Sequence, residues 1–117
     1  MDRDKFLKAV DSDEKPMDRG YYKKVIRESI DSLQNQNPRG HHNLIICMEE
    51  LAELQQAISK ELRGNGDTVN ILEEVADVLL CIGYIQEIVG LSDDLIVSAM
   101  NVKIDRLEKI LNKGEKP

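Results

Sequence analysis

The chain has 117 residues, of which 41% are hydrophobic and 32% are charged, and its formal net charge is −6. This length predicts one domain with a single core, and the acidic balance argues against DNA or RNA as a partner, because phosphate contacts need clustered Lys and Arg. A small phosphorylated ligand is not excluded, since a bound metal ion reverses the local sign of charge.

Residues 1–17 are polar and are interpreted as an N-terminal extension, in which Phe6, Leu7 and Val10 allow one short helix. The remaining residues, 18–117, are expected to form a single domain. The charged N-terminus is not followed by a long apolar run, so no signal peptide is expected.

Apolar residues then recur at helical spacing in four long segments, and no segment shows the period-two alternation of a strand. Breakers rich in Asn, Pro and Gly separate the segments, and Asp67 and Ser92 are good N-caps for the last two. The predicted helices cover about residues 18–34, 42–62, 67–89 and 92–112.

The third predicted helix is apolar on every side over Val78 to Ile85. Short loops favour antiparallel packing, so we expect an all-α, four-helix bundle-like fold. Four helices of this length barely bury such a helix, and we therefore expect the chain to associate with itself. An isolated bundle is the alternative.

The apolar run from Val78 to Ile85 is too short to cross a membrane, so no membrane partner is expected. Cys47 and Cys81 lie in apolar helical stretches and lack the C-x-x-C spacing of a zinc site. They are interpreted as buried, reduced thiols, which indicates a cytoplasmic protein.

Two acidic motifs, about twenty residues apart, lie on the second and third predicted helices. In each, two acids stand at i and i+3, namely Glu50 with Glu53 and Glu74 with Asp77. Like charges at this spacing destabilise a helix, and no Lys or Arg occurs between residues 63 and 103 to relieve the second motif. A tight Gly-Asn-Gly turn joins the helices, so the four carboxylates can converge.

These acids could be solvated helix surface, but their apolar neighbours favour a functional interpretation. A carboxylate such as Asp77 on an apolar helix has to be paired, protonated or bound to metal. All-carboxylate ligation by Glu50, Glu53, Glu74 and Asp77 suits Mg²⁺, with Mn²⁺ as the alternative. A di-iron site is disfavoured because neither motif has a His at i+3; His41 and His42 are assigned a surface or indirect role.

The motif pair Glu49-Glu50-Leu51-Ala52-Glu53 and Glu74-Val75-Ala76-Asp77 resembles the signature of the MazG-like all-α nucleoside triphosphate pyrophosphohydrolases. This family is related to the dimeric dUTPases, the dCTP pyrophosphatases and phosphoribosyl-ATP pyrophosphatase. The resemblance covers about residues 20–112. It implies a Mg²⁺-dependent enzyme that cleaves the α–β phosphate bond of a (d)NTP, giving (d)NMP and pyrophosphate, in nucleotide-pool housecleaning.

The resemblance also implies roles for individual residues. Glu50, Glu53, Glu74 and Asp77 would hold the metal, and Glu49 or Glu53 is our hypothesis for the general base. Four further residues are candidates for substrate binding: Asn101, Lys103, Arg106 and, more weakly, Lys60. The last helix's cations could equally be there to complement the helix dipole.

The short chain fits the small tetrameric MazG-like proteins better than the dUTPases, so a homotetramer is favoured over a dimer. Two other classes of function stay open. One is a non-catalytic helical oligomerisation module whose acids are only surface, and the other is a nucleotide- or metal-sensing protein without turnover. The preferred base and sugar cannot be deduced, because the only rings able to stack on a base are Tyr21, Tyr22, Tyr84 and the two histidines.

Overall fold

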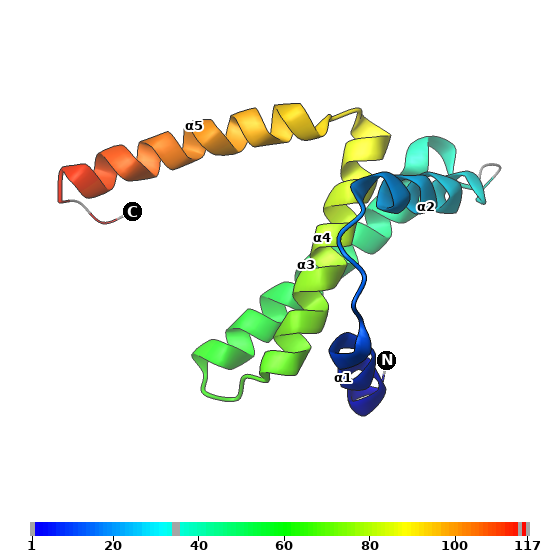
Figure 1. Ribbon diagram of the computed structural model, residues 1–117, viewed down its shortest axis with the longest axis horizontal. Helices are drawn as coiled ribbons and strands as arrows, with labels where there is room; N and C mark the ends of the chain where they lie inside the picture. The colour runs from blue at the N-terminus through cyan, green and yellow to red at the C-terminus, as the bar shows by residue number, and fades with distance from the viewer. Residues whose placement is uncertain (1, 34–35, 115, 117) are drawn as a thin grey trace.

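The structure, a computed structural model, describes residues 2–33, 36–114 and 116 and confirms an all-α chain. Over these residues there is no strand (Figure 1). Five α-helices and one short 3₁₀ helix follow one another: α1 (Arg3–Ser12), α2 (Arg19–Asp31), η1 (Pro38–Gly40), α3 (His41–Leu62), α4 (Thr68–Val89) and α5 (Asp93–Asn112).

Local capping explains why the last helices begin and end where the sequence predicts. The Asp67 side chain accepts a hydrogen bond from the Val69 backbone N–H at 3.0 Å, and the Ser92 side chain accepts one from the Leu95 N–H at 3.2 Å. Gly90 ends α4 in the left-handed region, with φ of 85°, which favours glycine. Each boundary is therefore encoded within a few residues.

The predicted first long helix ends earlier than expected. Helix α2 stops at Asp31, and the Leu33 N–H bonds to the Ile30 carbonyl at 3.3 Å in the tighter 3₁₀ pattern. The predicted end at Gln34 lies outside the described residues. The short helix allowed in the N-terminal extension is present as α1.

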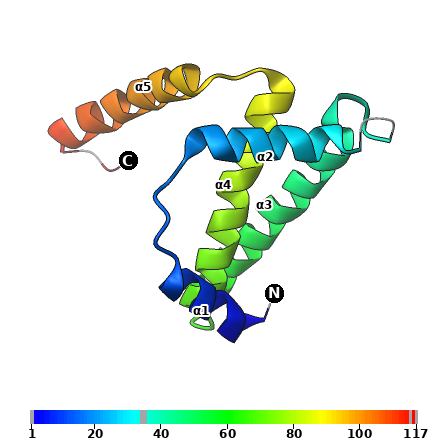
Figure 2. The same ribbon diagram turned by 45° about the vertical axis from the view of Figure 1, so that its right-hand side comes forward.

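Helices α3 and α4 form an antiparallel hairpin, and α2 crosses α4 while α1 lies at its N-terminal end (Figure 2). The α2–α4 approach is close because Gly83 has no side chain; a Cβ there would lie 2.6 Å from Ile26 Cδ1. Across the same contact, the Tyr84 hydroxyl donates to Ser29 Oγ at 2.8 Å. The hairpin and α2 together hold the core, which includes Ile26, Cys47, Ala57 and Cys81.

Helix α5 behaves differently, because it turns away from α4 by 117° and extends from the rest of the molecule (Figure 1). Its first residue, Asp93, is held by Lys23 Nζ at 2.8 Å and by Gln86 Nε2 at 2.9 Å. No residue of α5 is buried. The fourth helix of the expected bundle is thus not packed on the other three within this chain.

Among the described helices, none by itself is long and apolar enough to span a membrane. The bent pair α4 and α5 would meet those criteria together, by length and composition alone.

Candidate metal centre

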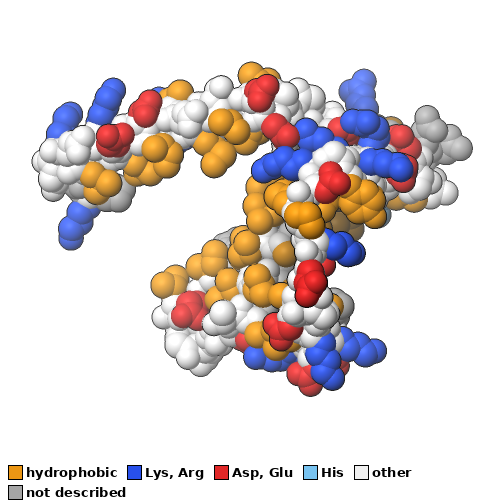
Figure 3. Space-filling view, in the orientation of Figure 1, with side chains coloured by type: hydrophobic (Ala, Val, Ile, Leu, Met, Phe, Trp, Pro, Cys, Tyr) orange, Lys and Arg blue, Asp and Glu red, His pale blue; other side chains and the backbone are white. Residues whose placement is uncertain are grey.

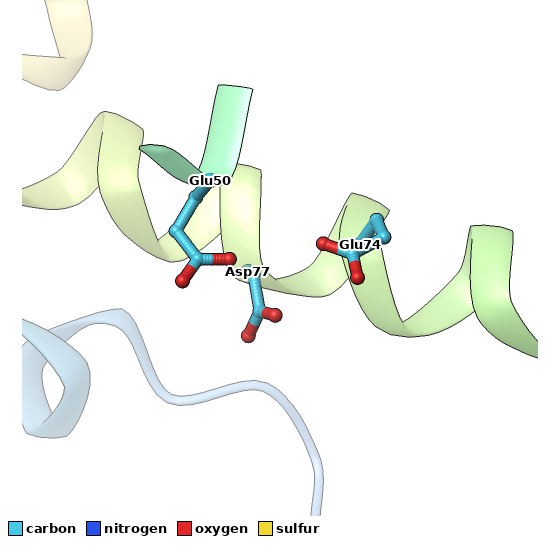
Figure 4. A group of neighbouring side chains, drawn as sticks. All are labelled: Glu50, Glu74 and Asp77. Atoms are coloured by element: carbon cyan, nitrogen blue, oxygen red, sulfur yellow. The ribbon is translucent and has the colours of Figure 1, made fainter. Parts of the chain in front are cut away.

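Three carboxylates converge between the two helices of the hairpin. Glu50 comes from α3, whereas Glu74 and Asp77 come from successive turns of α4, and one oxygen of each lies within 4.8 Å of the other two (Figure 4). The antiparallel pairing of α3 and α4 places the middle of one motif opposite the middle of the other. Of the four carboxylates that the spacing from the Gly-Asn-Gly turn predicted to converge, three therefore do so, and Glu53 is not in the group.

Two buried thiols adjoin this cluster. Cys47 lies about one turn before Glu50, and Cys81 lies about one turn after Asp77. The Cys47 thiol donates to the Cys81 carbonyl oxygen at 3.7 Å. Burial, and next the adjacent Cys47 thiol, raise the pKa of Cys81 to about 12, so this thiol is protonated near neutral pH and is a poor nucleophile. The pair gives the carboxylates an apolar neighbourhood.

Burial perturbs the ionisation of the cluster. The pKa of Glu50 is raised to about 7, first by burial and then by the negative charges of Asp77 and Glu53. The pKa of Glu74 is also raised, first by burial and then by the charges of Glu53 and Asp77. Full ionisation of this site near neutral pH is therefore costly unless a positive charge is nearby.

No side chain in the described part of the chain supplies that charge. The recorded ion pairs of Lys and Arg go instead to Asp67, Glu87 and Asp93. The buried atoms Glu50 Oε2 and Glu74 Oε2 have no hydrogen-bond partner. Buried polar atoms are normally satisfied, so these two oxygens need an explanation such as a bound ion. An all-oxygen donor set fits a hard cation, Mg²⁺ or Mn²⁺.

The two candidate general bases have different surroundings. Glu53 is exposed, yet it is close enough to Glu74 to raise the pKa of that carboxyl. Glu49 is also exposed but lies outside the converging group. The structure thus brings Glu53, and not Glu49, to the edge of the cluster.

The predicted substrate-binding residues of α5 are remote from this cluster in the same chain. Asn101, Lys103 and Arg106 are exposed on the projecting helix. From the helix rise and the 117° turn, the Cα atoms of Lys103 and Asp77 are on the order of 20 Å apart. Within one chain, these cations therefore do not reach the carboxylates.

Lys60, the weaker candidate, lies near the turn of the hairpin. It lines a cavity of about 330 Å³ together with Arg3, whose guanidinium pairs with Asp67. Glu73 from the second acidic motif lines the same cavity. None of the three converging carboxylates lines this cavity.

A larger cavity, of about 600 Å³, was not expected from the sequence. It lies at the start of α3 and is lined in part by Arg27, Arg39, His41 and Glu87. Asn37 is buried beneath it; this amide donates to Asn43 Oδ1, and its oxygen accepts from the His42 N–H at 2.7 Å. The sequence signal was the Asn-Pro-Arg-Gly segment, which predicts a chain break but not a hollow.

The three tyrosines line a separate, smaller groove. Tyr21, Tyr22 and Tyr84 line a groove of about 190 Å³ between α2 and α4. Tyr21 and Tyr22 are exposed, whereas Tyr84 is only partly exposed and its hydroxyl bonds to Ser29. Ring surface is therefore available on this side of the molecule.

No protein-family model, curated protein or solved structure matches this chain. The chemistry of the carboxylate cluster is accordingly inferred from its geometry, its burial and its donor atoms.

Proposed function

We propose that this chain is a MazG-like, Mg²⁺-dependent nucleoside triphosphate pyrophosphohydrolase. It would cleave the α–β phosphate bond of a (d)NTP in the cytoplasm and so remove non-standard or surplus nucleotides. The observation that carries the proposal is the convergence of Glu50, Glu74 and Asp77. Two buried carboxylate oxygens of this cluster, Glu50 Oε2 and Glu74 Oε2, lack hydrogen-bond partners. The signature of the two motifs adds the reaction, which the geometry of the cluster does not specify by itself.

The cluster is better suited to binding a cation than to a structural role. Leaving carboxylates unpaired beside buried thiols destabilises the folded chain, because burial penalises the charged form. A purely structural hairpin would gain stability from apolar or paired residues at the same positions. A site that binds a divalent cation has a use for the uncompensated charge, which favours the enzyme over a passive oligomerisation module.

The residues divide into metal holders and a proton acceptor. Glu50, Glu74 and Asp77, with Glu53 at their edge, would hold Mg²⁺, which supplies charge neutralisation at the phosphate oxygens when bound. Glu53 is exposed to solvent and would accept a proton from the attacking water. Water adds across the α–β anhydride, the P–O bond between these phosphates breaks, and (d)NMP and pyrophosphate leave.

The direct test is pyrophosphate release from a panel of (d)NTPs, including dUTP, dCTP and nucleotides with oxidised or deaminated bases. Each reaction is run with Mg²⁺, with Mn²⁺ and with EDTA, and the nucleotide product is identified as monophosphate or diphosphate. Metal-dependent formation of (d)NMP and pyrophosphate is expected, and Glu53→Gln should abolish it with the fold intact. Release of inorganic phosphate and (d)NDP would contradict the proposed reaction.

Absence of turnover has two distinguishable meanings. If Mg²⁺ raises the melting temperature but no nucleotide is hydrolysed, the site binds metal and the sensing function replaces catalysis. If Mg²⁺ has no effect on melting either, the acids are helix surface and the proposal fails.

A further inference from the structure

The turn that joins α3 to α4 is the Gly-Asn-Gly segment 64–66, and all three of its residues are exposed. In Figure 3 the end of the hairpin projects at the lower left, and most of its visible surface there is backbone or uncharged polar side chain. Asn65 is the only asparagine of the sequence that is followed by glycine. Its side-chain amide therefore lies in the open, next to the least hindered backbone nitrogen that a chain can offer.

Two capping motifs surround Asn65 and leave one backbone group unused. At the end of α3, the Asn65 N–H donates to the Lys60 carbonyl oxygen at 2.9 Å, in the pattern of a Schellman motif. At the start of α4, the Asp67 side chain accepts a hydrogen bond from the Val69 N–H. None of the hydrogen bonds of the described turn uses the Gly66 N–H, which lies between the two motifs. Its nitrogen is therefore not held in place by the fold's own hydrogen bonds.

The packing of the turn requires glycine at position 66. A Cβ there would lie 2.8 Å from the Glu61 Cα and would overlap the Glu61 carboxylate. A residue without a side chain fits this space, and it is also the residue that least obstructs an approach of its nitrogen to Asn65. The same glycine that lets the hairpin close thus leaves the neighbouring amide chemically accessible.

Two other asparagines show what distinguishes Asn65. Asn37 precedes Pro38, which has no N–H to lose. Asn70 precedes Ile71, whose N–H is held in α4 by the Asp67 carbonyl oxygen at 3.0 Å. Asn70 lies in the same hairpin as Asn65, so it provides an internal reference for any reaction that depends on a free backbone nitrogen.

We propose that Asn65 is a site of spontaneous deamidation. The Gly66 nitrogen attacks the Asn65 side-chain carbonyl carbon and forms a C–N bond. The bond from that carbon to the amide nitrogen breaks, and the proton of the Gly66 N–H passes through solvent to the leaving group, which departs as ammonia. Water then opens the cyclic imide at either of its carbonyls, giving aspartate or isoaspartate at position 65. The net change is gain of a water molecule and loss of ammonia, without oxidation or reduction.

Both products alter the surroundings of the turn. Each replaces a neutral amide by a carboxylate, which changes the formal net charge from −6 to −7. Asn65 lines the cavity of about 330 Å³ that Lys60 and Arg3 also line, so the new charge lies near the ion pair of Arg3 with Asp67. Isoaspartate in addition inserts a carbon atom into the main chain between the two capping motifs. The reaction uses none of the converging carboxylates and so does not depend on the proposed enzyme activity.

The test follows deamidation residue by residue in the full-length chain. Wild type, Asn65→Gln and, as the matched control, Asn70→Gln are incubated for days at mildly acidic and at mildly alkaline pH in water enriched in heavy oxygen. Fragmentation mass spectrometry locates each new carboxylate, and isoelectric focusing follows the charge. Gln keeps the amide but carries one more methylene, which moves the amide carbon away from the attacking nitrogen. Asn65 is not among the residues with positive φ, so Gln fits its backbone.

In the wild type, Asn65 should gain a carboxylate that contains heavy oxygen, in two chromatographically distinct products of equal mass. The conversion should be faster at alkaline pH, because the attacking nitrogen has to lose its proton. Asn70 should convert at least roughly 10-fold more slowly, since the helix holds the nitrogen that would attack it. Asn70→Gln should behave like the wild type, whereas Asn65→Gln should keep its original charge.

Either of two results would overturn the proposal. One is an Asn65 that remains an amide in the folded wild type at alkaline pH, and the other is conversion of Asn65 and Asn70 at the same rate. Circular dichroism before incubation verifies that all three proteins are folded. Mass and charge are read without metal or nucleotide, so a failure of the pyrophosphate assay leaves this result unaffected.

Discussion

The α3–α4 hairpin and α5 are both amphipathic helical segments, but they satisfy their side chains in different ways. The hairpin buries Cys47, Ala57 and Cys81 and holds its acids together at the expense of their ionisation. Helix α5 buries none of its residues and leaves its apolar face exposed, namely Val97, Met100, Ile104, Leu107 and Leu111. In the hairpin the groups without a partner are carboxylate oxygens, which a cation would neutralise. In α5 the exposed groups are apolar side chains, which another protein surface would cover.

This difference shows that one chain can be incomplete in two independent respects. A divalent cation would neutralise the carboxylates without affecting α5, and a second copy would cover α5 without neutralising the carboxylates. Substitutions in one region should therefore leave the property of the other region largely intact.

The largest effect is expected from Glu50→Gln, with its neighbour Glu49→Gln as the matched control. Loss of a metal-holding carboxylate should lower metal-dependent turnover by roughly 100-fold or more. Removing a charge from the crowded cluster should at the same time raise the melting temperature in EDTA. Glu49→Gln should change neither property much, because Glu49 lies outside the converging group. Steady-state rates and melting curves are the measurements; equal losses of turnover in both variants would contradict this assignment.

Hydrogen exchange should next separate the hairpin from α5. In the wild type at high protein concentration, amides of both regions should be protected. Ile104→Glu places a charge on the exposed apolar face of α5. In this variant, or after dilution below the dissociation constant of the expected self-association, α5 should lose protection first because nothing in its own chain covers it. Protection of α5 that is independent of concentration and of this substitution would show that the helix is stable alone.

The pH dependence of stability is the third expectation, and its sign follows from the raised pKa values of Glu50 and Glu74. A carboxyl whose pKa is higher in the folded state binds more protons when folded, so it favours folding at low pH. The metal-free chain should lose stability as pH rises from about 4.5 to about 7. Saturating Mg²⁺ should reduce this loss, and melting curves in EDTA and in Mg²⁺ would show it. A metal-free chain that becomes more stable over this window would contradict the assigned burial.

The smallest effect is expected where α2 meets α4 through the ion pair of Arg27 Nε and Glu87 Oε1, at 2.7 Å. This pair lowers the pKa of Glu87, so its contribution is lost only as the pH falls through the acidic range. Exposed ion pairs contribute little and are screened by salt. Glu87→Gln should lower the melting temperature slightly at low salt and not measurably at high salt. A large decrease that persists at high salt would indicate a structural role beyond the ion pair.

The sequence predicted helices well where their ends depend on adjacent residues. Asp67, Gly90 and Ser92 mark boundaries through caps that involve the next few residues only. The end of α2 was predicted too late because the chain continues to turn after Asp31 in a tighter pattern that residue spacing does not reveal.

The carboxylate cluster was partly predictable for a similar reason. The turn at Gly64 fixes which residues of α3 and α4 lie at the same height, so the meeting of Glu50 with Glu74 and Asp77 follows from counting. The path of α5 does not follow from counting. Its heptad spacing identifies the apolar face, but the same spacing suits a contact within the chain or with a second copy. The positions of Lys103 and Arg106 relative to the carboxylates were therefore beyond the reach of the sequence pattern.

The most direct test of the central claim is a Mg²⁺ titration of the melting temperature near neutral pH for wild type, Glu50→Gln and Glu49→Gln. If Glu50, Glu74 and Asp77 hold the cation, the wild type and Glu49→Gln should melt at progressively higher temperatures as Mg²⁺ is added, and Glu50→Gln should not respond. If all three respond equally, or none responds, these converging carboxylates are not a metal centre.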